Sequence, residues 1–227
     1  MRDVIRTNGL IIAADNSGAI GEKEHDAVRA PYEVVGYFSA RVALMECMAA
    51  GGEPFAAVLH NFSGNAAWKL LKEGVQRAAA ELGCTLEVTG STESNFSMLQ
   101  SAAGMVIIGR HAREAGCVEG SEVQYGVVGK PLVGNEVLEC AEDVAPLAVF
   151  HEIVKMEGVR AVLPVGSKGI AYELGQLSGK KGRCELDMKK SAGPSTCFLV
   201  AFEEGAEQRI EEAAGRLYRL RLVESGC

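Results

Sequence analysis

The sequence predicts an α/β protein, in the mixed α+β form, with two domains. Short runs rich in β-branched residues alternate with longer segments whose apolar residues recur at helical spacing. Turns containing glycine and proline separate these segments, as Gly51-Gly52 does before Pro54. The chain has 227 residues, of which 48% are hydrophobic, which fits a folded globular protein of one large or two small domains.

The first domain is expected to cover residues 1–130. Each predicted strand is a short apolar run, and the strands fall at 10–14, 55–62, 85–89 and 105–109. Each predicted helix ends at a glycine, and the helices cover 33–50 and 66–82. Strands that alternate with helices in this way predict a layered α/β domain.

The second domain is expected to cover residues 131–227. A largely helical stretch, 136–155, should be interrupted or restarted by Pro146. Residues 159–165 fit either a short strand or a loop that leads to the next helix. The remaining elements are read from apolar content and spacing: a helix at 168–177, a strand at 196–202 and a helix at 205–218.

Composition and charge exclude several classes of function. The net charge of −7 argues against a nucleic-acid-binding protein, which would carry a basic patch. We find no apolar run long enough to span a bilayer and no secretory signal. The seven cysteines form no C-x-x-C pair, which argues against a zinc site and fits a reducing cytoplasm.

The segment from Leu10 to Lys23 is the first candidate site. An apolar strand ends in Asp15-Asn16, and a flexible loop with Gly18 and Gly21 follows. A carboxylate beside exposed backbone N–H groups suits Mg²⁺ together with phosphate. Lys23 is a candidate phosphate contact. In the alternative interpretation Asp15 only forms a turn and Lys23 is an ordinary exposed lysine.

Glu46 is the second candidate. It lies in a helical segment of apolar and small residues, where an unpaired buried acid would cost several kcal/mol. It is therefore either on the solvent face or neutralised by a partner such as a metal ion.

Two further segments offer phosphate-binding groups. Gly90-Ser91-Thr92-Glu93 follows a predicted strand and supplies glycine, hydroxyl groups and another acid, although a polar turn would look the same. Gly166-Ser167-Lys168-Gly169 is similar to a small phosphate loop but lacks the full G-x-x-x-x-G-K-[ST] pattern.

Together these segments resemble the family that includes aminoimidazole ribonucleotide (AIR) synthetase, thiamine monophosphate kinase, selenophosphate synthetase and the hydrogenase maturation dehydratase. Ala13-Ala14-Asp15 stands where the kinases have Thr-Thr-Asp. The helix up to Pro54 matches their Ser-Asp-x-Ala-Ala-Met-Gly-Ala-x-Pro motif, with Glu46 in place of the metal-binding Asp. Gly90–Glu93 is a weaker counterpart of their Gly-Gly-Asp-Thr loop, and Gly166–Ile170 of their Ser-Asp-Gly-Leu motif.

The chain also departs from the family pattern. Only Asp3 can stand in for the Gly-Asp-Asp segment before the first strand, Lys168 replaces an Asp, and the second domain is shorter. These departures imply an acceptor other than thiamine phosphate. Within the family, the phrases 15–21 and 163–169 resemble the α-ribazole kinases of cobalamin salvage.

The resemblance implies a two-domain AIR-synthase-like fold with a shortened second domain, in which two first domains pair into a homodimer. It implies ATP and Mg²⁺ as cofactors and transfer of a phosphoryl group to a small hydroxylated substrate. Asp15 and Glu46 would hold the metal, with Asp3 and Glu93 as weaker candidates, and Lys168 would neutralise charge. The phosphate would lie against the backbone near three glycines, Gly18, Gly21 and Gly90. A non-catalytic nucleotide-binding protein and an ATP-dependent ribonucleotide synthetase are the alternatives.

Overall fold

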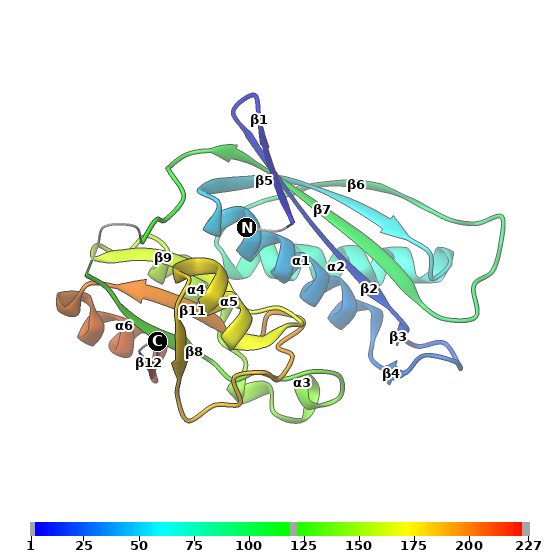
Figure 1. Ribbon diagram of the computed structural model, residues 1–227. Coiled ribbons are helices and arrows are strands. Elements are labelled where there is room, and N and C mark those ends of the chain that lie inside the picture. Colours follow the sequence, from blue (N-terminus) through cyan, green and yellow to red (C-terminus); the bar gives the residue numbers. More distant parts are fainter. Residues whose placement is uncertain (1–2, 119–121, 224–227) are drawn as a thin grey trace. The chain divides into compact units, whose positions relative to one another are not determined.

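The computed structural model describes residues 3–118 and 122–223. The chain divides into two compact units, Met1–Glu114 and Ala115–Cys227 (Figure 1). The second unit therefore includes residues that the sequence analysis assigned to the first domain, among them strand β8 (Gln124–Val128).

The first unit is built on a five-stranded sheet in the order β1-β2-β7-β5-β6. Neighbouring strands are antiparallel except for the parallel pair β5 and β6. The first two strands form a hairpin around Asn8-Gly9, a dipeptide that favours tight hairpin turns. The strands are β1 (Val4–Thr7), β2 (Leu10–Gly18), β5 (Gly52–Asn61), β6 (Glu87–Thr92) and β7 (Ala102–His111).

Two helices cover one face of this sheet (Figure 1). Helix α1 (Tyr32–Ala49) packs on β2, β7 and β5, and helix α2 (Asn65–Glu81) packs mainly on α1. Successive side chains of each strand point to opposite faces of the sheet. Ile11, Ile107 and Leu59 point to the face that the helices cover, and they are fully buried there. A small parallel pair, β3 (Ile20–Gly21) and β4 (Val28–Arg29), lies in the loop before α1.

The other face of this sheet is apolar, and none of the described helices of the first unit lies on it. Ile5, Ile12 and Ile108 pair across three adjacent strands, and Val106 pairs with Val58 in the next row of that face. These side chains are partly exposed, and Ile5 is 63% exposed.

The second unit has a sheet in the order β10-β12-β8-β11-β9, with all described pairs antiparallel. Helix α5 (Gly169–Ser178) covers one face through Ile170 and Leu174, which belong to the same core as Tyr125. On the other face, Phe150 of helix α4 (Leu147–Ile153) packs edge-on against Phe198. The strands not yet bounded are β9 (Val159–Pro164), β10 (Lys181–Arg183), β11 (Phe198–Phe202) and β12 (Tyr218–Val223).

The remaining helices of the second unit are short. Helix α3 (Glu136–Glu139) and the 3-10 turn η1 (Ala141–Asp143) precede α4, so the expected interruption at Pro146 is confirmed. Helix α6 (Glu207–Ala214) follows the 3-10 turn η2 (Glu204–Ala206). Within the described residues, no helix combines the length and apolarity that crossing a bilayer requires.

The structure differs from the sequence prediction at several elements. The first predicted strand continues past Ala14 to Gly18, because residues 15–18 pair along β7. Strands β1, β8 and β12 were not predicted, since they are short or carry charges. The helix expected at 205–218 ends at Ala214, and Gly215, which has a positive φ of 72°, separates it from β12. Residues 159–164 form a strand.

Candidate phosphate and metal site

Three strands of the first unit end at the same edge of the sheet. Because β2 and β5 are both antiparallel to β7, and β6 is parallel to β5, all three run in one direction. Asn61 and Thr92, the last residues of β5 and β6, share one row with Ser17, which precedes the last residue of β2: Ser17 and Asn61 both pair with Ala103, and Asn61 pairs with Thr92. Ligands of open α/β sheets bind outside such carboxyl ends.

Both long helices begin at this edge. Helix α1 joins β5 by a tight turn at Ala50-Gly51, so its other end, Tyr32, lies toward the edge where β2, β5 and β6 stop. Helix α2 begins at Asn65, shortly after β5 stops at Asn61. The N-terminus of a helix carries partial positive charge and free N–H groups, which favour bound anions.

Asp15 lies near the end of β2, on the sheet face that α1 covers. The pKa of its carboxyl is raised to about 7, chiefly by burial; a hydrogen bond from the Asn16 backbone opposes this rise, and the nearby negative charge of Asp3 adds to it. Asp3 is held there by a hydrogen bond of 3.1 Å from the Ala14 backbone N–H to its backbone oxygen. A desolvated carboxyl with a second negative charge near it favours binding of a cation.

The loop between β2 and α1 is organised by Asp26. Its carboxylate accepts hydrogen bonds from the Ser101 N–H (2.6 Å), the Ser101 hydroxyl (2.7 Å) and the Lys23 N–H (2.9 Å). These bonds lower the pKa of Asp26 against the opposing effect of burial. Gly21 is required at this point, because a Cβ there would lie 2.4 Å from the Ser101 hydroxyl oxygen. The loop is therefore fixed by its own hydrogen bonds.

Lys23 connects this loop with the segment before β7. Its ammonium group donates to the Met98 carbonyl at 2.8 Å and lies 3.5 Å from the Gln100 carbonyl. A phosphate contact by Lys23 would have to replace or share these bonds. Gly18, the last residue of β2, has open space where a side chain would be, so a ligand can approach its backbone.

The end of β6 carries the expected glycine and hydroxyl groups. At Gly90 a Cβ would lie 1.8 Å from the Leu59 carbonyl oxygen, so glycine allows β5 and β6 to pair here. The Thr92 hydroxyl accepts a hydrogen bond of 3.1 Å from the buried Asn61 side chain, whereas Ser91 is exposed. Gly90 and Asp15 lie in one row across four strands, so three strand spacings, roughly 14 Å, separate them.

Glu93 forms a turn with the residues that follow it. Its carboxylate accepts from the N–H groups of Asn95 (2.6 Å) and Phe96 (3.1 Å), and these bonds lower its pKa. Glu93 is partly exposed, so its carboxylate remains accessible to a cation.

Glu46 is buried in the last turn of α1, with 4% of its surface exposed. The thiol of Cys47, the next residue in the chain, lies close to Gly52 and Gly109. Gly109 pairs with Ile11 of β2, so this turn of α1 lies over the row of Ile11. Asp15 is four residues further along β2, about 13 Å from that row. The solvent-face alternative for Glu46 is therefore wrong, and its metal-binding role stays a prediction.

The described residues contain no group of three or more His, Cys, Asp or Glu side chains that could hold a metal ion. The pair Asp3 and Asp15 still fits Mg²⁺, because this ion is commonly held by one or two carboxylates together with phosphate oxygens and water.

Lys168 belongs to the second unit, immediately before α5. Its ammonium group lies 4.4 Å from the centre of the Tyr172 ring, a cation–π contact across one helical turn. Gly169 has a positive φ of 77°, and a Cβ there would lie 2.8 Å from the Lys190 carbonyl oxygen. The loop 166–169 is thus shaped by close backbone contacts within this unit.

No protein-family model matches the sequence, and no curated protein matches it. Solved structures do match. Thiamine monophosphate kinase from Aquifex aeolicus is 15% identical, with a TM-score of 0.66 over 98% of this chain and 88% of that one. The hydrogenase maturation protein HypE from E. coli is 11% identical, with a TM-score of 0.61 over 93% of this chain and 79% of that one.

The protein has the AIR-synthase-like fold. The expected two-domain form of that fold, shorter than these structures, is confirmed. At such low identity the likeness shows the AIR-synthase-like fold alone.

Sequence reasoning did not identify Asn61 as part of the site edge, nor Ser101 as the partner of Asp26. Asn61 donates to the Gly64 carbonyl at 2.9 Å and accepts from the Ser63 N–H at 2.9 Å, so it shapes the turn before α2. The one sequence signal was Asn61 at the end of an apolar run, before Ser63-Gly64.

Proposed function

We propose that this protein binds ATP with Mg²⁺ and transfers the γ-phosphoryl group to a hydroxyl group of a small metabolite, in the cytoplasm. The observation that carries this proposal is the desolvated carboxyl of Asp15, with the negative charge of Asp3 near it, at the edge where three strands end and two helices begin. A structure of similar fold, 15% identical, is thiamine monophosphate kinase in complex with AMPPCP and TMP, which supports a phosphoryl donor and an acceptor in this fold.

In this proposal, acidic side chains bind the metal ion and backbone N–H groups bind the phosphate. Asp15 and Asp3 would hold Mg²⁺. Glu46 and Glu93 lie too far from Asp15 along the sheet to bind the same ion, so they are candidate ligands for a second one. When bound, the ion would neutralise charge on the phosphate oxygens. The backbone near Gly18, with the N-termini of α1 and α2, would stabilise phosphate oxygens through N–H groups.

Other residues would position the donor and the acceptor. Gly21 and Gly90 let the backbone approach closely, Ser91 and Thr92 offer hydroxyl groups, and Lys23 would share its ammonium group with phosphate. Lys168 would stabilise negative charge on the acceptor or on the phosphoryl group during its transfer. Phosphoryl transfer depends mainly on such positioning and neutralisation, so no covalent intermediate is needed.

For the acceptor we propose α-ribazole, which rests on the resemblance of residues 15–21 and 163–169 to the α-ribazole kinases. We also propose a homodimer formed through the apolar outer face of the first sheet. That face presents Ile5, Ile12 and Ile108 in one row, and pairing two such faces would remove them from water.

The test is ATP turnover with Mg²⁺ in the presence of α-ribazole and other hydroxylated acceptors, followed by ³¹P NMR. We expect a new phosphate monoester signal that depends on the acceptor and decreases in Asp15→Asn. Binding of ATP without any product would favour the non-catalytic nucleotide-binding alternative. Phosphate release coupled to amide or ring chemistry would favour the synthetase.

A further inference from the structure

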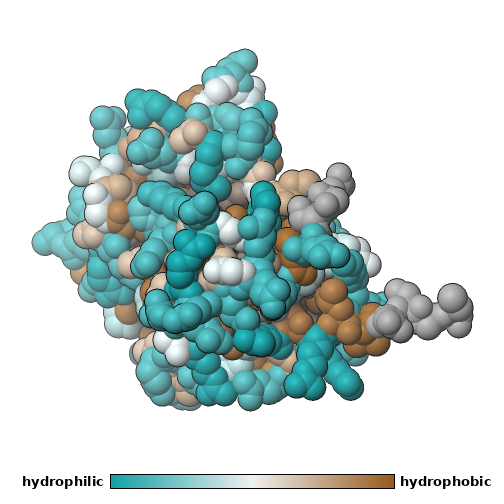
Figure 2. Space-filling view, turned by 90° about the vertical axis from the view of Figure 1, so that its left-hand side faces the viewer, coloured by the Kyte–Doolittle hydropathy of each residue, from teal (hydrophilic) through white to brown (hydrophobic). Residues whose placement is uncertain are grey.

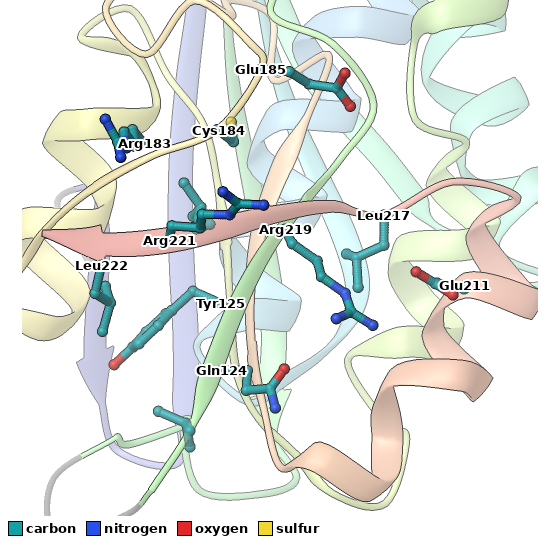
Figure 3. A pocket seen from close by; sticks show the side chains of 12 residues that line it. Gln124, Tyr125, Arg183, Cys184, Glu185, Glu211, Leu217, Arg219, Arg221 and Leu222 are labelled. Carbon is teal, nitrogen blue, oxygen red and sulfur yellow. The ribbon is translucent and has the colours of Figure 1, made fainter.

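The second unit contains a pocket of about 930 Å³ beside the edge of its sheet (Figure 3). Residues from β8, β10, β12 and α6 line it, among them Arg183, Arg219 and Arg221. The face of the protein in Figure 2 is largely hydrophilic. The chain carries a net charge of −7, yet the residues that line this pocket include three arginines and two glutamates, Glu185 and Glu211.

The three arginines lie on the same face of the sheet. Tyr218 and Leu220 belong to the core under α5, so the alternate residues Arg219 and Arg221 point to the opposite face. Arg183 on β10 pairs directly with Arg221 on β12, which places it on that face as well. Figure 3 shows Glu211 of α6 at the other side of the pocket.

Two of these arginines have no counter-charge among the residues that the structure describes. Arg219 forms an ion pair with Glu207, and the neighbouring Arg216 forms one with Glu185 at 3.0 Å. The guanidinium groups of Arg183 and Arg221 have no ion-pair or hydrogen-bond partner among residues 3–118 and 122–223. Like charges directly opposite each other on adjacent strands are destabilising, with Cβ atoms about 5 Å apart.

We propose that this pocket binds a small metabolite through an oxyanion group, held between Arg183 and Arg221. Each planar guanidinium can donate two parallel hydrogen bonds to a phosphate or carboxylate, and a bound oxyanion removes the repulsion between the two cations. Glu211 adds a negative charge at the far side, so the anionic group would bind at the β10–β12 end. The site lies wholly within the second unit and does not depend on the function proposed above.

The test uses the full chain labelled with ¹⁵N-arginine, without Mg²⁺ and at low ionic strength, because salt screens exposed charges. The Nε–Hε signals of Arg183 and Arg221 are assigned from their loss in Arg183→Gln and Arg221→Gln. Inorganic pyrophosphate and succinate are titrated separately to distinguish phosphate from carboxylate ligands. We expect both signals to shift together, with a dissociation constant of about 1 mM or tighter for at least one probe.

The matched control is Arg160→Gln, which removes an arginine of the same unit that pairs with Glu203 outside the pocket. Arg183→Gln should weaken the binding reported by Arg221 at least tenfold, whereas Arg160→Gln and Asp15→Asn should not change it. Signals that stay unmoved up to about 10 mM of both probes would overturn the proposal. So would equal shifts of Arg160, since they would indicate unspecific surface binding.

Discussion

Asp3 lies close enough to Asp15 for its negative charge to raise the pKa of the Asp15 carboxyl, adding to the effect of burial. The pKa of Asp15 reaches about 7, so near neutral pH this acid is only partly ionised in the metal-free protein. A cation bound between the two carboxylates would favour their charged forms. We therefore expect this pair to bind a cation.

The first prediction concerns ATP binding. Asp15→Asn should weaken the affinity for ATP in the presence of Mg²⁺ at least tenfold, because it removes a carboxylate that holds the ion. Calorimetric titration of both proteins, with and without Mg²⁺, measures this effect. Equal affinity in all four titrations would exclude Asp15 from the site.

The second prediction concerns stability in the absence of metal. The pKa of Asp15 is about 7 in the folded protein and 3.8 in the reference state, so ionisation opposes folding. The protonated Asp15 carboxyl stabilises the folded protein. This stabilisation is complete below pH 4, decreases as the pH rises toward 7 and is absent above that. The free energy of unfolding of Asp15→Asn should therefore exceed that of wild type by up to about 4 kcal/mol at pH 8.

The measurement for this second prediction is urea unfolding of both proteins, at pH 4 and pH 8, with chelator present. At pH 4 the two free energies should nearly coincide, because the wild-type carboxyl is then largely protonated in the folded protein. A difference that is the same at both values would show that the substitution acts through packing instead.

The third prediction separates the two interpretations of Glu46 that remain. If the buried acid contributes to metal binding, Glu46→Gln should reduce turnover at least tenfold while the protein stays folded, and this is the result we expect. Circular dichroism and urea unfolding check the fold, and turnover is measured over a range of Mg²⁺ concentrations. Wild-type turnover in a folded variant would leave Glu46 with a purely structural role.

The fourth prediction concerns Lys168. Lys168→Ala should lower turnover more than it weakens ATP binding, because the proposed role is on the acceptor side. Lys189→Ala, which removes an exposed lysine of the same unit, serves as the control. If Lys168→Ala matches wild type in both turnover and ATP affinity, Lys168 only packs on Tyr172.

The fifth prediction tests how α1 and α2 pack. A Cβ at Gly74 would lie 2.0 Å from the Glu33 carbonyl oxygen, so Gly74→Ala should destabilise the protein by about 2–4 kcal/mol. Gly175→Ala, in α5, meets open space and should stabilise it by about 0.5–1 kcal/mol. Urea unfolding of both variants gives the comparison, and similar free energies for the two would contradict close packing of the helices at Gly74.

Local sequence patterns predicted the long elements well and the short ones poorly. Helices α1 and α2 begin and end within about one residue of their predicted bounds, because apolar spacing and glycine stops are local signals. Strand β12 alternates buried Tyr218 and Leu220 with Arg219 and Arg221, and it was predicted in part as helix. Its pairing with β8 and β10 comes from distant parts of the chain.

The sequence alone determined the class of fold, the helix–strand alternation of the first unit and the choice of Asp15 as a candidate ligand, because each depends on neighbouring residues. Only the tertiary structure decided that Asp15 lies near Asp3, that Glu46 on helix α1 is buried, and that Arg183 on β10 pairs with Arg221 on β12. Helix packing buries Glu46, and strand register places the other residues. Register is set by the packing of whole sheet faces, which no local stretch of sequence specifies.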